Sequence, residues 1–440
     1  MSQKPILFQN FSILIYGLGK SGVSSFKYLY KKNNLYCYDD YNIKTPNRLI
    51  KKKIIEKIEI NKISFDYIVI SPGINIRNCK LSKFLKKNKK KIITDLDIFY
   101  LTNPQNFKIA ITGSNGKSTT AKILFNILKK YKREVRLCGN IGKPILNEKS
   151  IKKKTCFVIE VSSYQLEYSN FFKSNFAVVL NISNDHLERH VNIKNYTFSK
   201  FKLLYQQEKS DRCFIDLSQN FIKKYLELKN INSKITNIKL DNLENLKKDI
   251  ENTYFHNLSN LKNLQFVMKI CKYFKIEKKK VLNVVRNFKS LNYRQQILFK
   301  KKNVTCINDS KSTSFSSSVD ILKSYDKIYW IVGGIPKKKD KLEMEKKYYK
   351  NITAFITGKN SKFFEKEFRN KISYFRIKNF KKLIKKIIKI SNMNKNLKIK
   401  KCILFSPAAA SFDKFKNFEE RGKYFNEIVR KTKLRSLICN

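Results

Sequence analysis

The sequence is poor in acidic residues, since its 440 residues include 34 Asp and Glu against 94 Lys and Arg. No apolar run approaches the ~18 residues that a membrane-spanning helix needs, and residues 1–10 lack the charged and apolar stretches of a secretory signal. None of the nine cysteines stands in a Cys-x-x-Cys pair, which disfavours a disulfide framework and a zinc site. These absences predict a cytoplasmic protein with reduced thiols and no membrane insertion.

The formal charge of +60 suggests a polyanionic partner, and two interpretations are open. Lysine is spread along the whole chain together with Asn, Ile, Phe and Tyr, which indicates a compositional bias. Runs such as 86–91 lie between apolar periodic segments, where a solvated face is expected. We therefore expect no specific nucleic-acid partner, although the positive field should attract phosphorylated ligands.

The length of the chain exceeds one ordinary core, and alternating strand and helix patterns divide it into three segments. We expect domains at 1–103, 104–291 and 292–440. In each segment polar clusters follow the strands, where open parallel sheets bind their ligands. The expected fold class is α/β with three domains: an N-terminal Rossmann-like domain, a central P-loop ATPase-like parallel sheet and a C-terminal Rossmann-like domain.

The most informative stretch is 109–120, in which an apolar strand enters a glycine-bearing turn that leads into a helix beginning near Lys117. Glycines let backbone N–H groups close around phosphate oxygens, and the helix N-terminus and Lys117 add positive charge. Ser118 can offer its hydroxyl to magnesium. Only two residues separate Gly113 from Gly116, whereas the usual phosphate loop has four. A strand–turn–helix joint without a nucleotide is the alternative at this point.

The first segment has Gly17, Gly19 and Gly22 in a Gly-x-Gly-x-x-Gly pattern directly after a strand, with Asp39 and Asp40 about twenty residues on. Taken alone, this fingerprint predicts NAD. A diphosphate of another nucleotide would be held equally well, because glycines and the helix dipole bind pyrophosphate rather than nicotinamide. The residues leave both ligands open.

Two buried strands of the second segment also end in polar residues. Glu160 follows the strand 156–159, where a nucleotide–magnesium site needs its acid, and a surface glutamate is the alternative. His186 lies just past the strand 177–180. An isolated histidine is usually structural. Because successive strands each end in a polar cluster, a chance position for His186 is less expected. On composition alone, Lys200 is one lysine among many.

Together these residues resemble the Mur ligases, the ATP-dependent amino-acid-adding enzymes of peptidoglycan synthesis. The short loop 112–119 matches that family's own phosphate loop, which accounts for its spacing. Further matches follow in the family's order: Glu160, the Asn-x-x-x-Asp-His run ending at His186, His256-Asn257, Arg294 and Asp309-Ser310-Lys311. Within the family, the runs 160–167, 308–313, 406–413 and 415–422 are most similar to the members that add D-glutamate.

The resemblance implies a ligase whose substrates are ATP, UDP-N-acetylmuramoyl-L-alanine and D-glutamate. ATP would phosphorylate the alanine carboxylate, and the amine of D-glutamate would attack the acyl phosphate through a tetrahedral intermediate. The first segment would then hold UDP and not NAD. The catalytic residues would be Lys117, Glu160, His186 and Lys200. Ser118, Glu160, His186 and Lys200 would hold Mg²⁺ at two sites, with Lys200 carbamylated and Lys202 a minor rival. A monomer is expected.

The ligand contacts that the resemblance implies fall into three groups. ATP would contact Gly113, Ser114, Asn115, Gly116, Lys117, Ser118, Thr119, Asn257, Asn260, Arg294 and Asp309. The sugar nucleotide would contact Gly19, Lys20, Ser21, Asp39, Asp40, Ser71, Gly73, Asn140, Ser162 and Gln165. D-Glutamate would contact Lys311, Thr313, Lys337, Ser411, Phe412 and Phe418, whose cations and hydroxyls suit its two carboxylates.

A few positions depart from the family pattern. Tyr293 stands where the family usually has His, and Phe255 precedes His256 in place of a small residue. Residues 335–336 are Ile-Pro where a more polar link is typical, and Phe412 is bulkier than the usual aliphatic residue. These departures concern affinity, and in particular the placement of Lys337, more than the reaction.

Three other classes of protein share some of these sequence features. A sister ligase with another amino acid or a dipeptide, or a folylpolyglutamate synthase, is disfavoured by the runs at 406–413 and 418. A basic P-loop nucleic-acid-binding ATPase would explain the charge but not the first glycine loop. An NAD-dependent dehydrogenase would leave the phosphate loop without a function.

Overall fold

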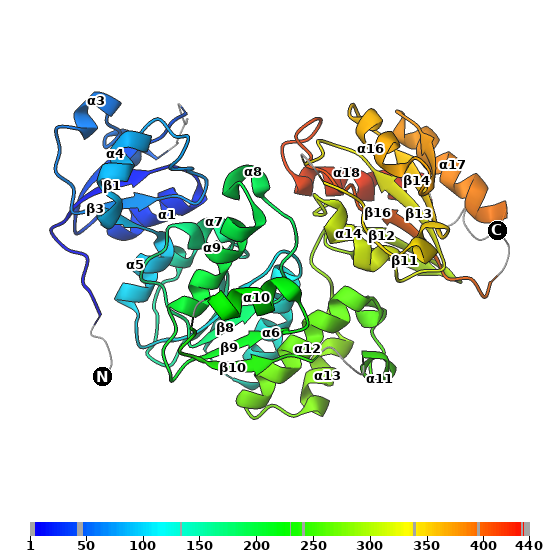
Figure 1. Ribbon diagram of the computed structural model, residues 1–440, viewed down its shortest axis with the longest axis horizontal. Helices are drawn as coiled ribbons and strands as arrows, with labels where there is room; N and C mark the ends of the chain where they lie inside the picture. The colour runs from blue at the N-terminus through cyan, green and yellow to red at the C-terminus, as the bar shows by residue number, and fades with distance from the viewer. Residues whose placement is uncertain are drawn as a thin grey trace. The chain divides into compact units, whose positions relative to one another are not determined.

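The computed structural model describes residues 5–41, 47–132, 134–228, 230–239, 243–337, 340–393, 397–432 and 434 (Figure 1). The chain forms two compact units. The first comprises 1–182, 186–240 and 265–277, and the second comprises 183–185, 241–264 and 278–440. Three sheets lie in the three segments that the sequence indicates, and the expected domain limits at 103 and 291 stay predictions.

The first sheet has four parallel strands in the order β2-β1-β3-β4. In chain order they are β1 (Ser12–Tyr16), β2 (Asn34–Tyr38), β3 (Tyr67–Ile70) and β4 (Ile92–Ile93). The helices are α1 (Lys20–Leu29), α2 (Arg48–Lys51), α3 (Lys57–Ile60), α4 (Ser82–Lys87), the 3₁₀ helix η1 (Lys89–Lys91) and α5 (Asp95–Thr102). Residues 13–16 of β1 are fully buried, as in a parallel strand that is covered on both faces.

The second sheet has six parallel strands in the order β10-β9-β8-β5-β7-β6. They are β5 (Phe107–Thr112), β6 (Val135–Gly139), β7 (Cys156–Glu160), β8 (Phe176–Val179), β9 (Arg212–Ile215) and β10 (Lys234–Asn237). The helices are α6 (Lys117–Tyr131), η2 (Ile145–Asn147), α7 (Ser163–Glu167), α8 (Leu187–His190), α9 (Ile193–Tyr205) and α10 (Asn220–Leu228). After the sheet come α11 (Leu243–Lys248), η3 (Thr253–His256), α12 (Leu258–Tyr273) and α13 (Lys278–Arg286).

The first two sheets share one apolar core inside the first unit. Phe26 of α1 and Phe99 of α5 belong to the same buried cluster as Ile145 of η2 and Phe157 of β7. The rings of Phe99 and Phe157 meet edge to face, with 4.9 Å between their centroids. Side chains from the segments of both sheets therefore pack in one core.

The third sheet has six strands in the order β11-β12-β16-β13-β14-β15. They are β11 (Gln296–Lys301), β12 (Val304–Asn308), β13 (Lys327–Val332), β14 (Ile352–Ile356), β15 (Ser373–Arg376) and β16 (Lys401–Phe405). The helices are α14 (Phe315–Leu322), α15 (Lys346–Tyr349), α16 (Ser361–Phe368), α17 (Phe380–Met393) and α18 (Phe418–Lys431). Buried apolar clusters cover both faces of this sheet.

One strand of the third sheet departs from the expected parallel arrangement. β11 pairs antiparallel with β12, whereas the other strand pairs of this sheet are parallel in the described residues. Only Lys302 and Asn303 connect β11 to β12, and so short a loop can join only antiparallel strands. Among the described residues, no helix has the length and apolar character to cross a membrane.

Candidate functional site

The phosphate loop joins β5 to α6, and two glycines with positive φ shape it. The φ of Gly113 is 150° and that of Gly116 is 82°, which favour glycine. Asn181, at the end of the neighbouring β8, holds the loop. Its Oδ1 accepts from the N–H of Asn115 at 2.8 Å, and its carbonyl accepts from the N–H of Ser114 at 2.9 Å. The sequence placed Asn181 in a polar run but indicated no role for it.

Lys117 begins α6 and folds back over the loop. Its Nζ donates to the carbonyl oxygens of Gly113 and Ser114, each at 2.8 Å. The ammonium therefore lies at the N-terminus of a helix of 15 residues, where the helix dipole also favours an anion. A phosphate at this position would meet a cation and a helix N-terminus together.

Glu160, the last residue of β7, presents its buried carboxylate to the same loop. Its Oε2 accepts from Ser118 Oγ at 2.5 Å, and its Oε1 accepts from Asn140 Nδ2 at 2.7 Å. Gly139 makes the close approach possible, because a Cβ there would lie 2.3 Å from the Glu160 carbonyl oxygen. The structure thus brings Asn140, which was predicted to contact the sugar nucleotide, to the carboxylate of Glu160, which was predicted to hold magnesium together with Ser118.

The oxygen donors around Glu160 are of the kind that magnesium prefers. Among the described residues, no group of three or more His, Cys, Asp and Glu could hold a metal ion. A magnesium ion is commonly bound by one or two carboxylates together with substrate phosphates. Ser118 and Glu160 therefore fit a metal that the nucleotide helps to hold.

Lys200 lies on α9 with its side chain directed at the phosphate loop. It is 1% exposed, and its Nζ donates to the Gly113 carbonyl at 2.8 Å. The ammonium lies 4.6 Å from the ring centroid of Tyr196, whose hydroxyl is 3.0 Å from Ser114 Oγ. Lys202 instead donates to the carbonyl of Glu167 at 2.9 Å, which separates the two lysines that the sequence left as rivals.

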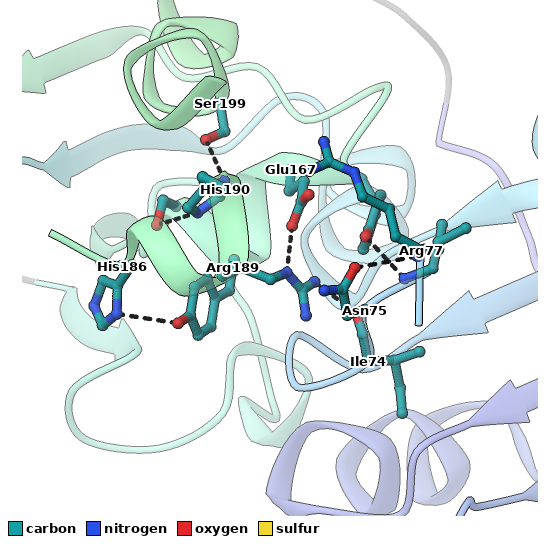
Figure 2. Close-up of polar contacts among 12 residues, drawn as sticks. Ile74, Asn75, Arg77, Glu167, His186, Arg189, His190 and Ser199 are labelled. Carbon is teal, nitrogen blue, oxygen red and sulfur yellow. Dashed lines mark hydrogen bonds and ion pairs between the residues drawn. The ribbon is translucent and has the colours of Figure 1, made fainter. Parts of the chain in front are cut away.

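His186 precedes α8 in left-handed geometry, with φ of 54°. Its Nδ1 lies 3.0 Å from the Tyr164 hydroxyl, and its ring centroid is 6.5 Å from that of Tyr196. His190, which the sequence did not assign, is buried, with Nε2 3.0 Å from Ser163 Oγ (Figure 2). Burial lowers the pKa of His190 to about 4, so this imidazole is neutral near pH 7.

The first glycine loop joins β1 to α1 and is braced from two sides. Gly17 has φ of 93°, and a Cβ on Gly22 would lie 1.8 Å from the Gly17 carbonyl oxygen. Ser71 Oγ donates to that carbonyl at 2.6 Å, and Asp39 Oδ2 accepts from the N–H of Leu18 at 2.6 Å. Ser71 and Asp39 therefore shape the loop in addition to any contact with a ligand.

Other residues predicted for the sugar nucleotide also have structural partners. Asp40 accepts from the Tyr16 hydroxyl at 2.6 Å. Ser162 and Gln165 cap α7, because the Ser162 N–H donates to Gln165 Oε1 at 3.1 Å and the Gln165 N–H donates to Ser162 Oγ at 3.2 Å. Ser21 hydrogen-bonds Asp95, whose pKa burial raises to about 6. Three residues, Gly19, Lys20 and Gly73, are exposed around the same loop.

In the second unit, Asp309 follows β12 and is buried. Its Oδ1 accepts from the N–H of Gln295 at 3.1 Å, and its Oδ2 accepts from Ser406 Oγ at 2.9 Å. Burial raises the pKa of Asp309 to about 7, which the charge of Arg294 opposes. Asn260 Nδ2 donates to Gln295 Oε1 at 3.1 Å. Gln295, which the sequence did not single out, therefore joins residues predicted for ATP.

Asn257 lies beside Asn260 and caps the start of α12. Its Oδ1 accepts from the N–H of Asn260 at 2.9 Å, and its Nδ2 donates to the carbonyl of Tyr254 at 2.9 Å. Nδ2 of Asn260 donates to the same carbonyl at 2.9 Å. Both amides thus order the start of this helix, so a role in adenine binding stays a prediction.

The residues predicted for D-glutamate are dispersed over loops of the same unit. Lys311 Nζ lies 4.0 Å from the ring centroid of Phe418, so these two predicted residues meet. Lys337 forms an ion pair with Asp185. Phe412 is 72% exposed. Ser411 is buried after β16, and Thr313 is half-buried after β12.

Arg421 of α18 organises the loops that carry several of these residues. It is 3% exposed, and burial lowers the pKa of its guanidinium to about 10. Its Nε donates to Ser310 Oγ at 3.1 Å, its Nη2 to the Ser310 carbonyl at 2.7 Å and its Nη1 to the Ala409 carbonyl at 2.9 Å. The loops after β12 and β16 are therefore held together by one side chain without a predicted role.

Comparisons with known proteins agree on one family. A family model described as the Mur ligase middle domain matches residues 111–284. The chain is 30% identical over 440 residues to UDP-N-acetylmuramoylalanine--D-glutamate ligase of Rickettsia felis, covering 95% of this chain and 96% of that protein. The protein of the same name from Rickettsia prowazekii is 31% identical over 445 residues, covering 95% and 97%. The crystal structure of MurF ligase from Thermotoga maritima in complex with ADP has a similar fold, with a TM-score of 0.54, 14% identity and 96% of each chain covered.

Proposed function

The chain belongs to the Mur ligase family, and on this premise we propose that it joins D-glutamate to UDP-N-acetylmuramoyl-L-alanine, with ADP and phosphate as the other products. The names of the two relatives support this choice of amino acid. The observation that carries the proposal is the meeting of Lys117, Ser118, Glu160 and Lys200 at one phosphate loop. A nucleotide held there would have its phosphates among cations and a buried carboxylate.

The chemistry requires an activated carboxylate, because a free carboxylate is a poor acyl donor. In the proposed reaction the γ-phosphoryl group moves from ATP to the alanine carboxylate, and ADP leaves. The amine of D-glutamate then attacks the acyl carbon, and the tetrahedral intermediate collapses to the amide with loss of phosphate. Phosphoryl transfer needs positioning and positive charge more than covalent catalysis. Lys117 and the N-terminus of α6 would supply these.

Magnesium is part of the proposal. Ser118, Glu160, His186 and Lys200 would hold it at two sites, Lys200 as a carbamate formed when its amine adds to carbon dioxide and loses a proton. When bound, magnesium neutralises the charge that develops on the transferring phosphoryl group. The buried position of Lys200 beside the loop supports this assignment.

The proposal divides the chain by substrate. Residues 1–103 would bind the UDP group, 104–291 would bind ATP, and 292–440 would bind D-glutamate through Lys311, Thr313, Lys337, Ser411, Phe412 and Phe418. Asn257, Asn260, Arg294 and Asp309 would complete the ATP site. The enzyme is proposed to act in the cytoplasm as a monomer, with no specific nucleic-acid partner.

A panel of amino-acid acceptors tests the proposed function. Phosphate release from ATP by the purified protein is measured with UDP-N-acetylmuramoyl-L-alanine alone, with D-glutamate alone and with both. We expect release only with both, and no release when L-glutamate, meso-diaminopimelate or L-alanine replaces D-glutamate. Stimulation by one of these amino acids, or by single-stranded DNA without the sugar nucleotide, would refute the proposal.

A further inference from the structure

Arg189, the third residue of α8, has partners in two segments of the first unit (Figure 2). Its Nε donates to Glu167 Oε2 at 2.8 Å, and the two side chains are 6% and 12% exposed. Its Nη1 donates to the carbonyl of Gly73 at 3.3 Å, and its Nη2 to that of Ile74 at 2.5 Å. These contacts join a helix of the second sheet to the turn that follows β3 of the first sheet.

Two tyrosines enclose the guanidinium group. Cζ of Arg189 lies 5.1 Å from the ring centroid of Tyr164 and 5.5 Å from that of Tyr168. The hydroxyl of Tyr168 also accepts from the N–H of Ile76 at 3.1 Å, close to the same turn. Arginine alone has a planar fork that can stack on rings while it donates in several directions. The site therefore favours arginine over lysine.

The turn that Arg189 holds lies directly beside the first glycine loop. Ser71, which begins the turn, donates to the Gly17 carbonyl at 2.6 Å. At the other end, α8 follows His186, whose Nδ1 lies 3.0 Å from the Tyr164 hydroxyl. Arg189 thus connects the turn beside the proposed sugar-nucleotide site to the helix that follows a proposed catalytic residue.

A second joint between the two sheets does not depend on Arg189. Asp97 of α5 accepts at Oδ1 from Ser169 Oγ at 2.7 Å. The same oxygen accepts from the N–H groups of residues 170, 171 and 172 at 3.1, 2.8 and 3.0 Å. Together with the shared apolar core, this joint predicts that the first unit stays folded when Arg189 is replaced.

We propose that Arg189 is a positioning residue, which holds the turn 71–76 at a set place relative to the phosphate loop. It would thereby align the alanine carboxylate of the sugar nucleotide with the terminal phosphate of ATP, and in this the inference rests on the proposed function. A misplacement of about 1 Å costs ~100-fold in rate. Binding of each nucleotide to its own loop needs no such alignment.

The test compares Arg189→Ala with a matched control, Arg136→Ala. Arg136 also combines one carboxylate with two backbone carbonyls. It donates to Glu148 Oε2 at 3.0 Å and to the carbonyls of Lys149 and Ser150 at 2.5 and 2.9 Å. All of these partners lie within the segment of the second sheet. Arg136 does not join the two sheets. Arg136→Ala therefore measures the effect on kcat of losing an arginine that has similar contacts within one segment.

We expect Arg189→Ala to lower kcat by ~10- to 100-fold, with unchanged dissociation constants for UDP and for a non-hydrolysable ATP analogue. Added guanidinium ion should restore part of kcat, because it can occupy the vacated site between the same partners. Arg189→Lys should stay slow, since it keeps the charge and lacks the fork. Arg136→Ala should retain the wild-type kcat. Melting temperatures of the variants establish that each is folded.

Three results would overturn this inference: an unchanged kcat in Arg189→Ala, an equal fall in Arg136→Ala, or a joint loss of both nucleotide affinities without rescue by guanidinium. The last would indicate a merely structural role. A wild-type protein without D-glutamate ligase activity would instead refute the proposed function, so the two failures are distinguishable.

Discussion

The first unit contains two glycine loops, each between a parallel strand and a helix, and their surroundings differ. The backbone of the loop 17–22 accepts a hydrogen bond from Ser71 and donates one to Asp39. At the second loop, Lys117 and Lys200 donate to the Gly113 carbonyl, and Glu160 accepts from Ser118, the second residue of α6. The glycines of both loops can bind phosphate. In the proposed function, the groups that phosphoryl transfer needs lie at the second loop.

A glycine pattern therefore indicates where a phosphate can bind and not whether that phosphate is transferred. In the proposed function the first loop holds the diphosphate of a substrate that stays intact there. The second loop presents a phosphate that is transferred. The difference lies in the neighbouring strand ends. Asn181 after β8 hydrogen-bonds the second loop, Glu160 at the end of β7 accepts from Ser118, and Asn140 after β6 donates to Glu160.

The largest expected effect separates the lysines that follow the two loops. Lys117→Ala should lower kcat by ~1000-fold or more, because no ammonium group would then stabilise the negative charge on the transferring phosphoryl group. Lys20→Ala, the matched change at the first loop, should mainly raise the KM for the sugar nucleotide. Steady-state kinetics measures both, and an equal fall of kcat in the two variants would abolish the distinction between the loops.

The next largest effect separates Lys200 from Lys202, which lies two residues further along α9. Lys200→Ala should lower activity by ~100-fold, and short-chain carboxylates should restore part of it by replacing the proposed carbamate. Lys202→Ala should stay active, since Lys202 contacts the Glu167 carbonyl and not the loop. Activity is assayed with and without added formate or acetate. Full activity of Lys200→Ala would remove this residue from the site.

At the first loop, two glycines should respond differently to the same added methyl group. A Cβ on Gly22 would lie 1.8 Å from the Gly17 carbonyl oxygen, whereas nothing lies within 4 Å of a Cβ on Gly19. Gly22→Ala should lower the free energy of unfolding by about 2 kcal/mol, and Gly19→Ala should change it little. Urea denaturation measures both, and equal stabilities would contradict the tight packing of this loop.

The last expected effect, which is absent near neutral pH, is a pH dependence of stability from His190. Its pKa of about 4 in the folded protein lies below its ordinary value, so between these values the unfolded state binds the proton first. The stability gained by burying a neutral His190 is complete above the ordinary pKa of histidine and is lost as the pH falls toward 4. Melting temperatures should therefore fall more steeply over this range for the wild type than for His190→Asn. Parallel curves would contradict a buried, neutral His190.

Much of the architecture follows from local sequence, because parallel strands leave short apolar runs and their polar ends meet at one edge of the sheet. Glu160 and the loop at 113–118 could be placed on this basis alone. Tyr196 and Gln295 could not, since their roles depend on which helix or loop packs beside them. A signal for Tyr196 does exist, as an aromatic one helical turn before Lys200. Arg189 depends on the docking of two sheets and has no local signal.

The direction of β11 was likewise not predicted from its residues alone. Its apolar residues predict a strand, and the two-residue connection to β12 determines its antiparallel direction. The family resemblance supplied the predicted roles of Asn257 and Arg294, which the residues alone left open and which stay predictions. The position of polar residues such as Glu160 at strand ends could thus be predicted from the sequence. Contacts between distant elements required the structure.

Transfer of oxygen from the substrate to phosphate tests the central claim most directly. This claim is that the phosphoryl group held at the second loop is transferred to the carboxylate of the substrate whose diphosphate the first loop holds. UDP-N-acetylmuramoyl-L-alanine labelled with ¹⁸O at both oxygens of its alanine carboxylate is turned over with ATP and D-glutamate, and the released phosphate is analysed by mass spectrometry. The account predicts one labelled oxygen in each phosphate, because the bridging oxygen of the acyl phosphate leaves with phosphorus. Unlabelled phosphate accompanied by amide product would contradict it.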